Sequence, residues 1–392
     1  MPENRRVLVL NHFAVGAGQA GGTRHVELFG RLTGWDHLIV AADLNPQTGE
    51  RMTSEPGLTL VPVPTFSSNG PRRVVNWAAY AGRAFVTGMG QEDVDLVYGS
   101  SPHLLAAAAA WGVSFLKRKP FVMEVRDLWP QVLVDMGSLD EQSTIYRALS
   151  ALESFLYSRA AAIVTMAEGT EESLLSRGLP ESKIKFIPNG ADRHEPVGAF
   201  ERQELRATYK FTRFTAVYTG AHGPANNLAA LLDAARQLGS EEIDLVLVGG
   251  GLEKEQLIRR ATDDGLTNVR FMDPVPKSEM PALLAAADLG LHILADVDLF
   301  QTAISPNKVF DYMAAGLPVL TNNRGRIGDL VASSAAGWSC PTADLAEGIK
   351  KVSAMTARER NQVGESGARW LESNQSRTMM ADRLRSVLQS LV

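Results

Sequence analysis

The sequence predicts an α/β protein made of two doubly wound domains in series, and three observations support this fold class. The chain has 392 residues, more than one hydrophobic core usually serves, so two domains are the default expectation. Short apolar runs alternate with helical patterns, which predicts parallel sheets covered by helices on both faces. The alternation breaks near the middle, where Asn189 and Gly190 are followed by a polar stretch with Pro196 and Gly198.

The first domain is expected to span residues 1–190. Its strands are predicted from continuous apolar runs, which are typical of parallel strands buried on both faces. The predicted strands are residues 7–10, 38–41, 58–63, 94–98, 121–125 and 162–165.

The second domain is expected to span residues 200–369 and to repeat the same alternation. Its predicted strands are residues 214–219, 243–248, 269–272, 288–294 and 317–320. The last segment, residues 370–392, has apolar residues at helical spacing. We expect it to form one amphipathic helix that packs back on the first domain.

The composition is that of a globular protein, with 45% apolar and 21% charged residues. The formal net charge of -5 argues against a general nucleic-acid binder. Cys340 is the only cysteine, which excludes a disulfide framework and a cysteine-based metal site and favours a reducing, cytoplasmic setting. No signal peptide is visible, and the most apolar window, residues 104–116, is shorter than a membrane span. We expect a protein that does not cross a bilayer.

Polar residues follow the first predicted strand, at the edge of the sheet where open α/β folds bind ligands. Asn11 and His12 end that strand, and a glycine-rich loop with Gly21 and Gly22 then leads into a helix. Glycines ahead of a helix N-terminus are typical of an anion seat. The glycine spacing is not that of the dinucleotide fingerprint, which disfavours a nicotinamide dehydrogenase.

Two further strand ends in the first domain carry polar side chains. Ser100, Ser101 and His103 follow one strand, and Arg126 and Asp127 follow the next. Two adjacent charged residues directly after an apolar strand favour a cleft-facing site. An internal ion pair or a capping aspartate is the alternative.

A short helix is predicted after residue 304, with both of its ends marked by the sequence. Ser305 suits the N-cap, Pro306 suits the first helical position, and Gly316 with Pro318 closes the helix. Tyr312 is predicted to share a face with the charged residues of this helix.

Lys308 is an unusual residue for the first turn of this helix, because a cation there opposes the positive end of the helix dipole. An anion bound at the helix start removes that opposition. Asp311, one turn further on, is placed to accept hydrogen bonds from hydroxyls attached to the anion. A diphosphate linked to a ribose fits both requirements, and a Lys308–Asp311 surface pair is the alternative.

The order and spacing of these motifs resemble the family 4 glycosyltransferases with the GT-B fold, particularly bacterial surface-polysaccharide and amino-sugar transferases. The matching landmarks are Gly21-Gly22-Thr23-Arg24-His25, Glu124-Val125-Arg126-Asp127-Leu128-Trp129-Pro130, Ile187-Pro188-Asn189-Gly190, Tyr218-Thr219-Gly220, Leu247-Val248-Gly249-Gly250-Gly251 and the run from Ser305 to Leu320. The resemblance implies two doubly wound Rossmann-like domains that face a central cleft.

The resemblance further implies a retaining transferase that takes a sugar from a nucleotide diphosphate, most often UDP. The second domain would bind the donor, with an N-acetylated amino sugar among the candidate donors, and the first domain would admit a glycan, lipid-linked or small-molecule acceptor. The expected donor residues are Gly21, Gly22, Arg126, Gly220, His222, Gly250, Val275, Ser305, Pro306, Asn307, Lys308 and Asp311. Asp127, His12 and Lys308 are the catalytic candidates, with Asp127 and His12 orienting the acceptor hydroxyl and His103 on the acceptor side.

The chain departs from the family pattern in two places. Asp311 matches the second acid of the Glu-x7-Glu motif, which holds the ribose, but the first acid is replaced by Ala303. The family's Arg and Lys after the first strand of the second domain are also missing from Gly220–Asn227. Lys308 is therefore the main candidate for the diphosphate charge, with Arg126 and His222 as helpers.

We expect no cofactor beyond the nucleotide-sugar co-substrate, and no metal, because no Asp-x-Asp cluster stands at a strand end. Two alternatives stay open. One is a UDP-sugar 2-epimerase of the non-hydrolysing type, and the other is a non-catalytic nucleotide-sugar-binding partner protein, which the Ala303 departure keeps open.

Two stretches mix cations and aromatic residues in a way that suits a helix lying on an anionic membrane surface. One runs from Arg72 to Phe85 and includes Trp77 and Tyr80; the other runs from Trp111 to Lys119. They raise the hypothesis of a peripheral position at the inner face of the cell membrane, where a lipid-linked acceptor would be met. Ordinary packed helices with a solvated basic edge are the alternative.

Overall fold

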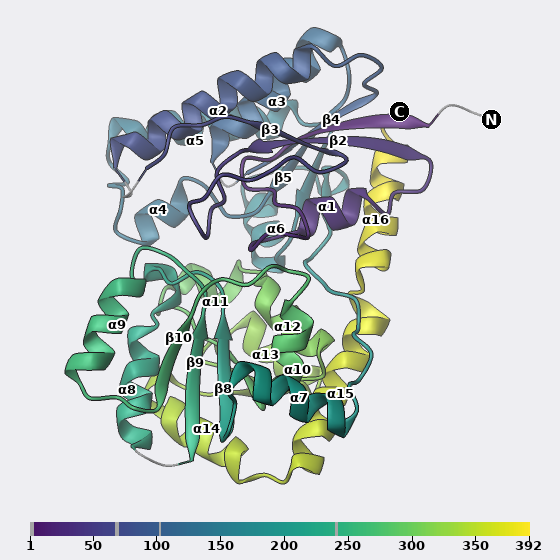
Figure 1. Ribbon diagram of the computed structural model, residues 1–392. Coiled ribbons are helices and arrows are strands. Elements are labelled where there is room, and N and C mark those ends of the chain that lie inside the picture. Colours follow the sequence, from purple (N-terminus) through teal and green to yellow (C-terminus); the bar gives the residue numbers. More distant parts are fainter. Residues whose placement is uncertain (1–3, 67–69, 102, 240–241) are drawn as a thin grey trace. The chain divides into compact units, whose positions relative to one another are not determined.

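The computed structural model describes residues 4–66, 70–101, 103–239 and 242–392. The chain divides into two compact units (Figure 1). Unit 1 consists of Met1–Pro188, Thr302–Ser305 and Arg377–Val392, and unit 2 consists of Asn189–Gln301 and Pro306–Ser376. Each unit contains one parallel sheet with helices on its faces, as the alternation of strands and helices predicts.

Unit 1 contains a 7-stranded sheet in the order β3-β2-β1-β4-β5-β6-β7. Its strands are β1 (Arg5–Leu10), β2 (Trp35–Ala42), β3 (Leu58–Val61), β4 (Leu96–Ser100), β5 (Phe121–Val125), β6 (Ala162–Thr165) and β7 (Ile184–Phe186). Its helices are α1 (Arg24–Phe29), α2 (Pro71–Met89), α3 (Leu104–Lys117), α4 (Gln131–Asp135), α5 (Thr144–Arg159), α6 (Glu168–Ser176), η1 (Glu181–Lys183) and α16 (Arg377–Gln389). The strand order reverses between β1 and β4, and such a switch point opens a crevice at the carboxyl ends of the strands.

Unit 2 contains a 6-stranded sheet in the order β10-β9-β8-β11-β12-β13. Its strands are β8 (Phe214–Thr219), β9 (Ile243–Val248), β10 (Val269–Met272), β11 (Leu289–His292), β12 (Val319–Thr321) and β13 (Gly337–Ser339). The order reverses between β8 and β11. The helices of this half are α7 (Ala199–Tyr209), η2 (Pro224–Asn226), α8 (Ala229–Leu238), α9 (Lys254–Asp263), α10 (Met280–Ala286), α11 (Asp298–Thr302), α12 (Asn307–Ala314), α13 (Arg326–Ser333), η3 (Thr342–Asp344), α14 (Leu345–Ala354) and α15 (Ala357–Asn374).

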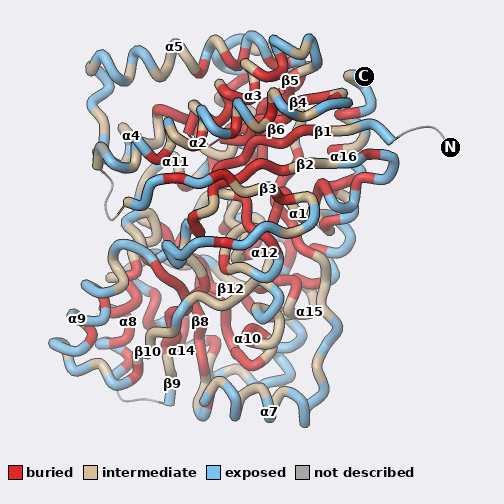
Figure 2. The backbone as a smooth tube through the Cα atoms, turned by 45° about the horizontal axis from the view of Figure 1, so that its top comes forward, coloured by how far each residue is buried: buried red, intermediate tan, exposed pale blue. Residues whose placement is uncertain are grey.

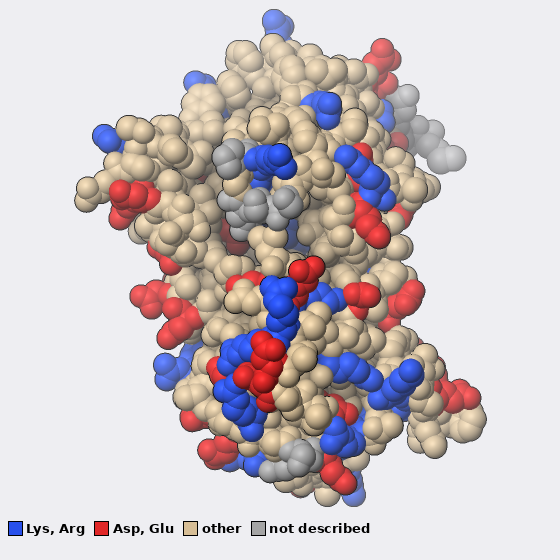
Figure 3. All heavy atoms as spheres, turned by 60° about the vertical axis from the view of Figure 1, so that its left-hand side comes forward, with Lys and Arg blue, Asp and Glu red and all other residues tan. Residues whose placement is uncertain are grey.

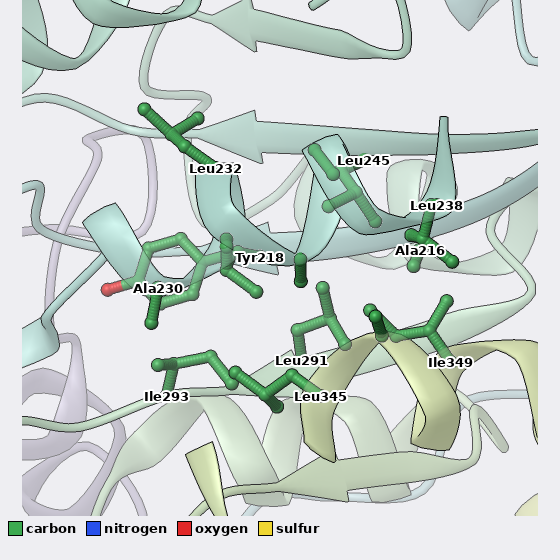
Figure 4. Packing of buried hydrophobic residues seen from close by; sticks show 14 of the residues in the cluster. Ala216, Tyr218, Ala230, Leu232, Leu238, Leu245, Leu291, Ile293, Leu345 and Ile349 are labelled. Carbon is green, nitrogen blue, oxygen red and sulfur yellow. The ribbon is translucent and has the colours of Figure 1, made fainter. Parts of the chain in front are cut away.

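The strands of each sheet form the buried centre of its unit (Figure 2). In unit 2, Leu245 and Leu291 of the sheet pack against Leu232 and Ile349 of the covering helices (Figure 4). Full burial of one such side chain stabilises the fold by roughly 1.5–3 kcal/mol. Tyr218 belongs to the same cluster, and its hydroxyl points away from Ile349 toward the end of β8 (Figure 4).

The predicted single helix at residues 370–392 is wrong. The chain forms two helices here, α15 in unit 2 and α16 in unit 1, because Gln375 leaves the helical conformation with φ -142° and ψ 40°. The second domain therefore continues to Ser376 instead of ending at residue 369. Met380, Leu384 and Leu388 of α16 lie in the core of unit 1.

No helix in the described ranges is long and apolar enough to cross a membrane. On the side shown in Figure 3, Lys and Arg side chains are interspersed with Asp and Glu. This mixture agrees with the small formal net charge of -5.

Candidate functional site

Glycine backbones line the carboxyl ends of the central strands of unit 2. Gly220, Gly249 and Gly251 have φ values of +133°, +149° and +144°, which disfavour other residues. A Cβ atom on Gly249 would lie 1.9 Å from the carbonyl oxygen of Gly220. The predicted residues Gly220 and Gly250 thus lie in two loops whose backbones touch, and the backbone N–H of His222 donates to the Gly250 carbonyl at 2.7 Å.

Lys308 of α12 extends its side chain to the loop after β8. Its Nζ donates to Tyr218 Oη at 2.8 Å and to Asn226 Oδ1 at 3.0 Å, and lies 4.1 Å from the centre of the Tyr218 ring. No carboxylate of the described chain forms an ion pair with this ammonium. Desolvation lowers the Lys308 pKa from 10.5 to about 7. An anion bound here would supply the counter-charge that the protein does not.

Two buried, neutral imidazoles lie near Lys308. His222 is 0% exposed, and neither of its ring nitrogens has a hydrogen-bond partner in the described part of the chain. Burial, with Lys254 and Lys308, lowers its pKa to about 4. His292 Nδ1 lies 2.8 Å from Thr321 Oγ1, whereas its Nε2 is without a partner among the same residues. Buried polar atoms are normally satisfied by protein or by ordered water, so these nitrogens are available to hydrogen-bond a ligand or a bound water.

The start of α12 differs from the prediction by one residue. Pro306, with ψ 126°, is the N-cap, Asn307 begins the helix, and no side chain caps it. Ser305 therefore does not serve as the predicted cap. The buried Asn307 Oδ1 has no partner among the described atoms.

Tyr312 does not share the charged face of α12 as predicted. It is 0% exposed, and its Oη accepts a hydrogen bond from the Thr219 N–H at 2.9 Å and donates to the Leu291 carbonyl at 3.1 Å. The ring fits because Gly290 lacks a side chain, since a Cβ there would lie 2.5 Å from it. Tyr312 thus ties α12 to the ends of β8 and β11.

Asp311 pairs with a residue that the sequence did not suggest. Lys277 Nζ lies 2.5 Å from Asp311 Oδ1, and the two side chains are 21% and 14% exposed. Lys277 comes from the loop after β10, where Val275, one of the expected donor residues, is half-buried. The alternative of a Lys308–Asp311 surface pair is not what the structure shows. A cation two residues after Val275, at a strand end, was the signal that could have pointed to Lys277.

In unit 1, Glu124 at the end of β5 is fully buried and satisfied by four side chains. Arg24 Nε lies 3.1 Å away, and His25 Nε2, Tyr98 Oη and Ser100 Oγ each lie 2.8 Å from one of its oxygens. Asn11 Nδ2 contacts His25 Nδ1 at 2.7 Å, while Asn11 Oδ1 accepts from the Phe13 N–H. His25 Nδ1 is therefore the acceptor, and its Nε2–H faces Glu124. This network is internal to unit 1. The His25 Nε2 contact with Glu124 is short, but it does not have hydrogen-bond geometry.

Arg24 extends the network to a second sequence landmark. Its two terminal nitrogens donate to the carbonyls of Ile187 and Pro188 at 2.7 and 2.8 Å. The landmarks around Gly22, Glu124 and Asn189 are thus joined by one buried guanidinium, a connection that sequence spacing could not reveal.

Asp127 differs from Glu124, three residues before it in the chain. It is half-buried, and its carboxylate makes no hydrogen bond or ion pair within the described residues. Burial raises its pKa, and the neighbouring Arg126 opposes that rise. Arg126 is also half-buried, and its backbone N–H donates to Ser101 Oγ at 3.1 Å. The two charges act on each other electrostatically. Their cleft-facing role stays a prediction.

The two predicted histidines of unit 1, His12 and His103, contact each other through their ring nitrogens. His103 Nε2 lies 2.8 Å from His12 Nδ1, and His103 Nδ1 accepts from the Ala106 N–H at 3.3 Å, which caps α3. His103 is 1% exposed and stacks on Trp77 at 5.2 Å. The prediction of an acceptor-side role for His103 is therefore corrected to a structural one. His12 is also buried, and burial with Arg73 lowers its pKa to about 3.

The glycine loop of unit 1 is a poorer anion seat than predicted. Gly21 and Gly22 lie in the loop before α1, and Gly21 has φ +140°. The Glu55 carboxylate lies against Gly16 of this loop, where an added Cβ would be 2.1 Å from its Oε2. A carboxylate at this position would repel a phosphate.

Two family models match the chain and together cover both units. One, described as a glycosyl transferase 4-like domain, matches residues 26–190. The other, described as glycosyl transferases group 1, matches residues 213–357. The chain belongs to the family 4-like glycosyltransferases. The resemblance deduced from the sequence motifs is confirmed.

Similar proteins and structures agree with this assignment. The chain is 26% identical over 228 residues to the probable glycosyltransferase WbjE of Pseudomonas aeruginosa, and the match covers 57% of this chain and 56% of WbjE. The sucrose-phosphate synthase of Thermosynechococcus elongatus is 15% identical, with a TM-score of 0.76 and 99% of both chains covered. Anabaena HepE in complex with UDP-glucose is 16% identical, with a TM-score of 0.72, 98% of this chain and 100% of HepE covered. The two structures show that the fold is GT-B.

Within the described residues, no group of three or more His, Cys, Asp or Glu side chains gathers in a way that could hold a metal ion. The structure brings together Gly220, His222, Gly250 and Lys308 at one end of the unit 2 sheet, and Asn307 precedes Lys308 on α12. Tyr218, Asn226, Lys277 and His292 belong to the same region and were missed, because their positions depend on packing across strands.

Proposed function

We propose that this protein is a retaining glycosyltransferase that moves a sugar from a nucleotide diphosphate, with UDP as the favoured nucleotide, to an acceptor hydroxyl. The observation that carries the proposal is the desolvated Lys308 ammonium, which has no acidic partner in the described chain and stands among orphaned polar atoms. The UDP-glucose held by the structurally similar HepE supports the choice of nucleotide.

Lys308 would neutralise the diphosphate as it leaves. Cleavage of the bond between the sugar C1 and the phosphate oxygen develops negative charge on the phosphate, and a preorganised cation stabilises that charge as it grows. Its Nζ reaches Asn226, within the loop Gly220–Asn227 that lacks the family's own cations. A lysine on α12 thus compensates for the Arg and Lys missing after β8.

Asp311 and Asn307 would recognise the ribose, and Val275 would contact the base. One carboxylate oxygen of Asp311 forms an ion pair with Lys277, and the carboxylate has no other hydrogen-bond or ion-pair partner in the described chain. Asn307 lies four residues before it, so the two side chains project from neighbouring positions on α12. Two acceptor oxygens on one helix face suit a ribose, which offers two hydroxyl donors.

Retention follows from attack on the same face of the sugar that the diphosphate leaves. The acceptor oxygen bonds to C1 while the C1–phosphate bond breaks, and the leaving phosphate takes the acceptor's proton. No dedicated base is needed. Asp127 would orient the acceptor hydroxyl, since its carboxylate is half-buried and unengaged in unit 1.

A peripheral contact with an anionic membrane remains part of the proposal for a lipid-linked acceptor. Unit 1 exposes Val75 and Val86 on α2, by 56% and 69%, and Phe115 and Leu116 on α3, by 65% and 56%. Exposed cations accompany them, at Arg72, Arg83, Arg118 and Lys119. Tyr80, predicted as part of this surface, is instead 0% exposed and donates to the Val40 carbonyl. Flotation with vesicles containing phosphatidylglycerol tests this contact, and no association at low salt removes it.

A non-catalytic nucleotide-sugar-binding protein is the second candidate, because Ala303 is buried and offers no acid where the family motif has its first one. A binding protein would show saturable UDP binding without sugar transfer. Incubation with UDP-glucose and UDP-N-acetylglucosamine over an acceptor panel separates the two.

The first test is calorimetric titration with UDP, with GDP for comparison, in the presence and absence of EDTA. UDP binding that is unaffected by EDTA and weakened in Lys308→Met supports the proposed donor site. Lys351→Met is the matched control, because Lys351 pairs with Glu347 on the exposed face of α14. No binding of either nucleotide would contradict the proposal.

A further inference from the structure

Asp311 pairs with Lys277 and not with Lys308 of its own helix, α12. Lys308 and Asp311 stand at positions i and i+3 on this helix, which is the spacing at which opposite charges on a helix pair. Such a pair would neutralise both groups. In the structure, Asp311 is instead bound by Lys277 at 2.5 Å, and Lys308 points to Tyr218 and Asn226.

We propose that Lys277 is a positioning residue of the donor site. It binds one oxygen of Asp311, leaves the second oxygen for the ribose hydroxyls, and keeps the carboxylate away from Lys308. This inference rests on the proposed function of the site as a nucleotide-diphosphate site, and it adds the residue that divides the site into an anion-binding half and a hydroxyl-binding half.

The burial of the pair supports this role over that of an ordinary surface ion pair. The side chains of Lys277 and Asp311 are 21% and 14% exposed, whereas the pair of Lys351 and Glu347 on α14 is 74% and 66% exposed. Ion pairs that water screens contribute little. A pair shielded from water holds its geometry and orients the carboxylate.

The groups around Lys308 show what loss of Lys277 would change. Tyr218 of β8, His222 of the following loop, His292 of β11 and Asp311 of its own helix are the titratable groups near it. Asp311 is the only acid in that set. If Lys277 is removed, Asp311 can turn toward Lys308, which would hold the ammonium protonated to higher pH and occupy it.

The experiment compares UDP, 2′-deoxy-UDP and 3′-deoxy-UDP on four proteins by titration calorimetry: wild type, Lys277→Met, Lys277→Arg and Asp311→Asn. Lys351→Met is the control for loss of a lysine, and thermal unfolding checks that each variant folds. Wild type is expected to bind at least one deoxy analogue about 10- to 100-fold more weakly than UDP, the range for a hydrogen bond to a charged group. Asp311→Asn is expected to reduce the ratio of UDP affinity to deoxy-analogue affinity.

Lys277→Met is expected to bring the ratio of UDP affinity to deoxy-analogue affinity within about threefold of unity. Lys277→Arg is expected to restore most of the wild-type ratio. The pH at which UDP affinity falls should also move upward in Lys277→Met. A folded Lys277→Met protein that keeps the wild-type ratio and the wild-type pH profile overturns the positioning role while the donor site stands. Absence of UDP binding to wild type overturns the proposed function and this inference together.

Discussion

Two clusters of ionisable residues stand at the strand ends of the two units, and they differ in how far the protein itself satisfies them. Around Glu124, four side chains meet one carboxylate. Burial raises the pKa of this carboxyl, but the His25 and Arg24 side chains against it hold the pKa well below the usual value. Around Lys308, the ammonium has no acid, and His222, His292 and Asn307 carry buried atoms without partners in the described chain.

The difference teaches how to separate a structural motif from a ligand site. A buried charge that is fully paired has no capacity left for a ligand. A half-buried, desolvated charge such as that of Lys308, whose neighbours are neutral, carries a cost in the free protein that a complementary ligand offsets. By this criterion the Glu124 cluster holds unit 1 together, and the Lys308 cluster is the better candidate for binding.

The largest expected effect is on stability, from Glu124→Gln. The change leaves the Arg24 guanidinium, whose side chain is 2% exposed, without its counter-charge, which costs about 3–5 kcal/mol. Urea unfolding followed by circular dichroism measures it. Glu347→Gln, which breaks an exposed pair on α14, serves as the control and should unfold like wild type. Equal stability of the two variants would contradict the structural reading of Glu124.

The second effect is on binding, from Lys308→Met. We expect UDP affinity to fall about 10- to 100-fold, as for loss of a charge-assisted hydrogen bond. Stability should not fall, because the removed charge is desolvated and unpaired. Calorimetry and thermal unfolding measure the two quantities. A Lys308→Met variant that loses stability and keeps its UDP affinity would show that Lys308 has a structural role and not a binding role.

The third effect is a pH dependence set by Lys308. Its pKa is about 7 in the folded protein and near 10.5 when unperturbed, so the ammonium form that binds phosphate is depleted above pH 7. UDP affinity should weaken by up to about tenfold per pH unit above roughly pH 7. Titrations at several pH values test this, and the slope should disappear in Lys308→Met.

The same shift has a consequence for stability, with a defined sign. Between pH 7 and 10.5 the unfolded chain binds more protons at Lys308 than the folded one. The contribution of this group to the free energy of unfolding therefore rises with pH across that window. The unliganded protein should gain stability in this range relative to Lys308→Met.

The smallest expected effect is that of Asp127→Asn, which probes the free carboxylate of unit 1. If Asp127 orients the acceptor, turnover with a UDP-sugar should fall roughly tenfold through misplacement of the hydroxyl, while UDP affinity stays unchanged. Steady-state kinetics and calorimetry on the same sample separate the two. A change in UDP affinity without a change in turnover would indicate that Asp127 contacts the donor and not the acceptor.

Much of the fold was predictable from local patterns. The apolar runs at 121–125, 162–165, 214–219, 243–248 and 269–272 coincide with strands β5, β6, β8, β9 and β10. Strands β5, β6, β8 and β9 are almost entirely buried, so nearly every position in them favours an apolar residue. Strand β10, at the edge of its sheet, is half-buried. Strand β13 was missed because Gly337-Trp338-Ser339 is short and half-polar. The break between α15 and α16 was missed because the apolar spacing continues across it.

The sequence by itself determined the fold class, the family, and Lys308 and Asp311 as the residues of greatest interest on α12. Those inferences rest on periodicity, on turn chemistry and on a charge that conflicts with the helix dipole, all of which act within a few residues. Only the tertiary structure decided which ionisable groups are satisfied. It assigned Lys277 to Asp311, enclosed Glu124 with Arg24 and His25, and placed His292 near Lys308. These partners come from separate strands and loops, and burial and pairing are properties of the packed sheet ends rather than of any segment.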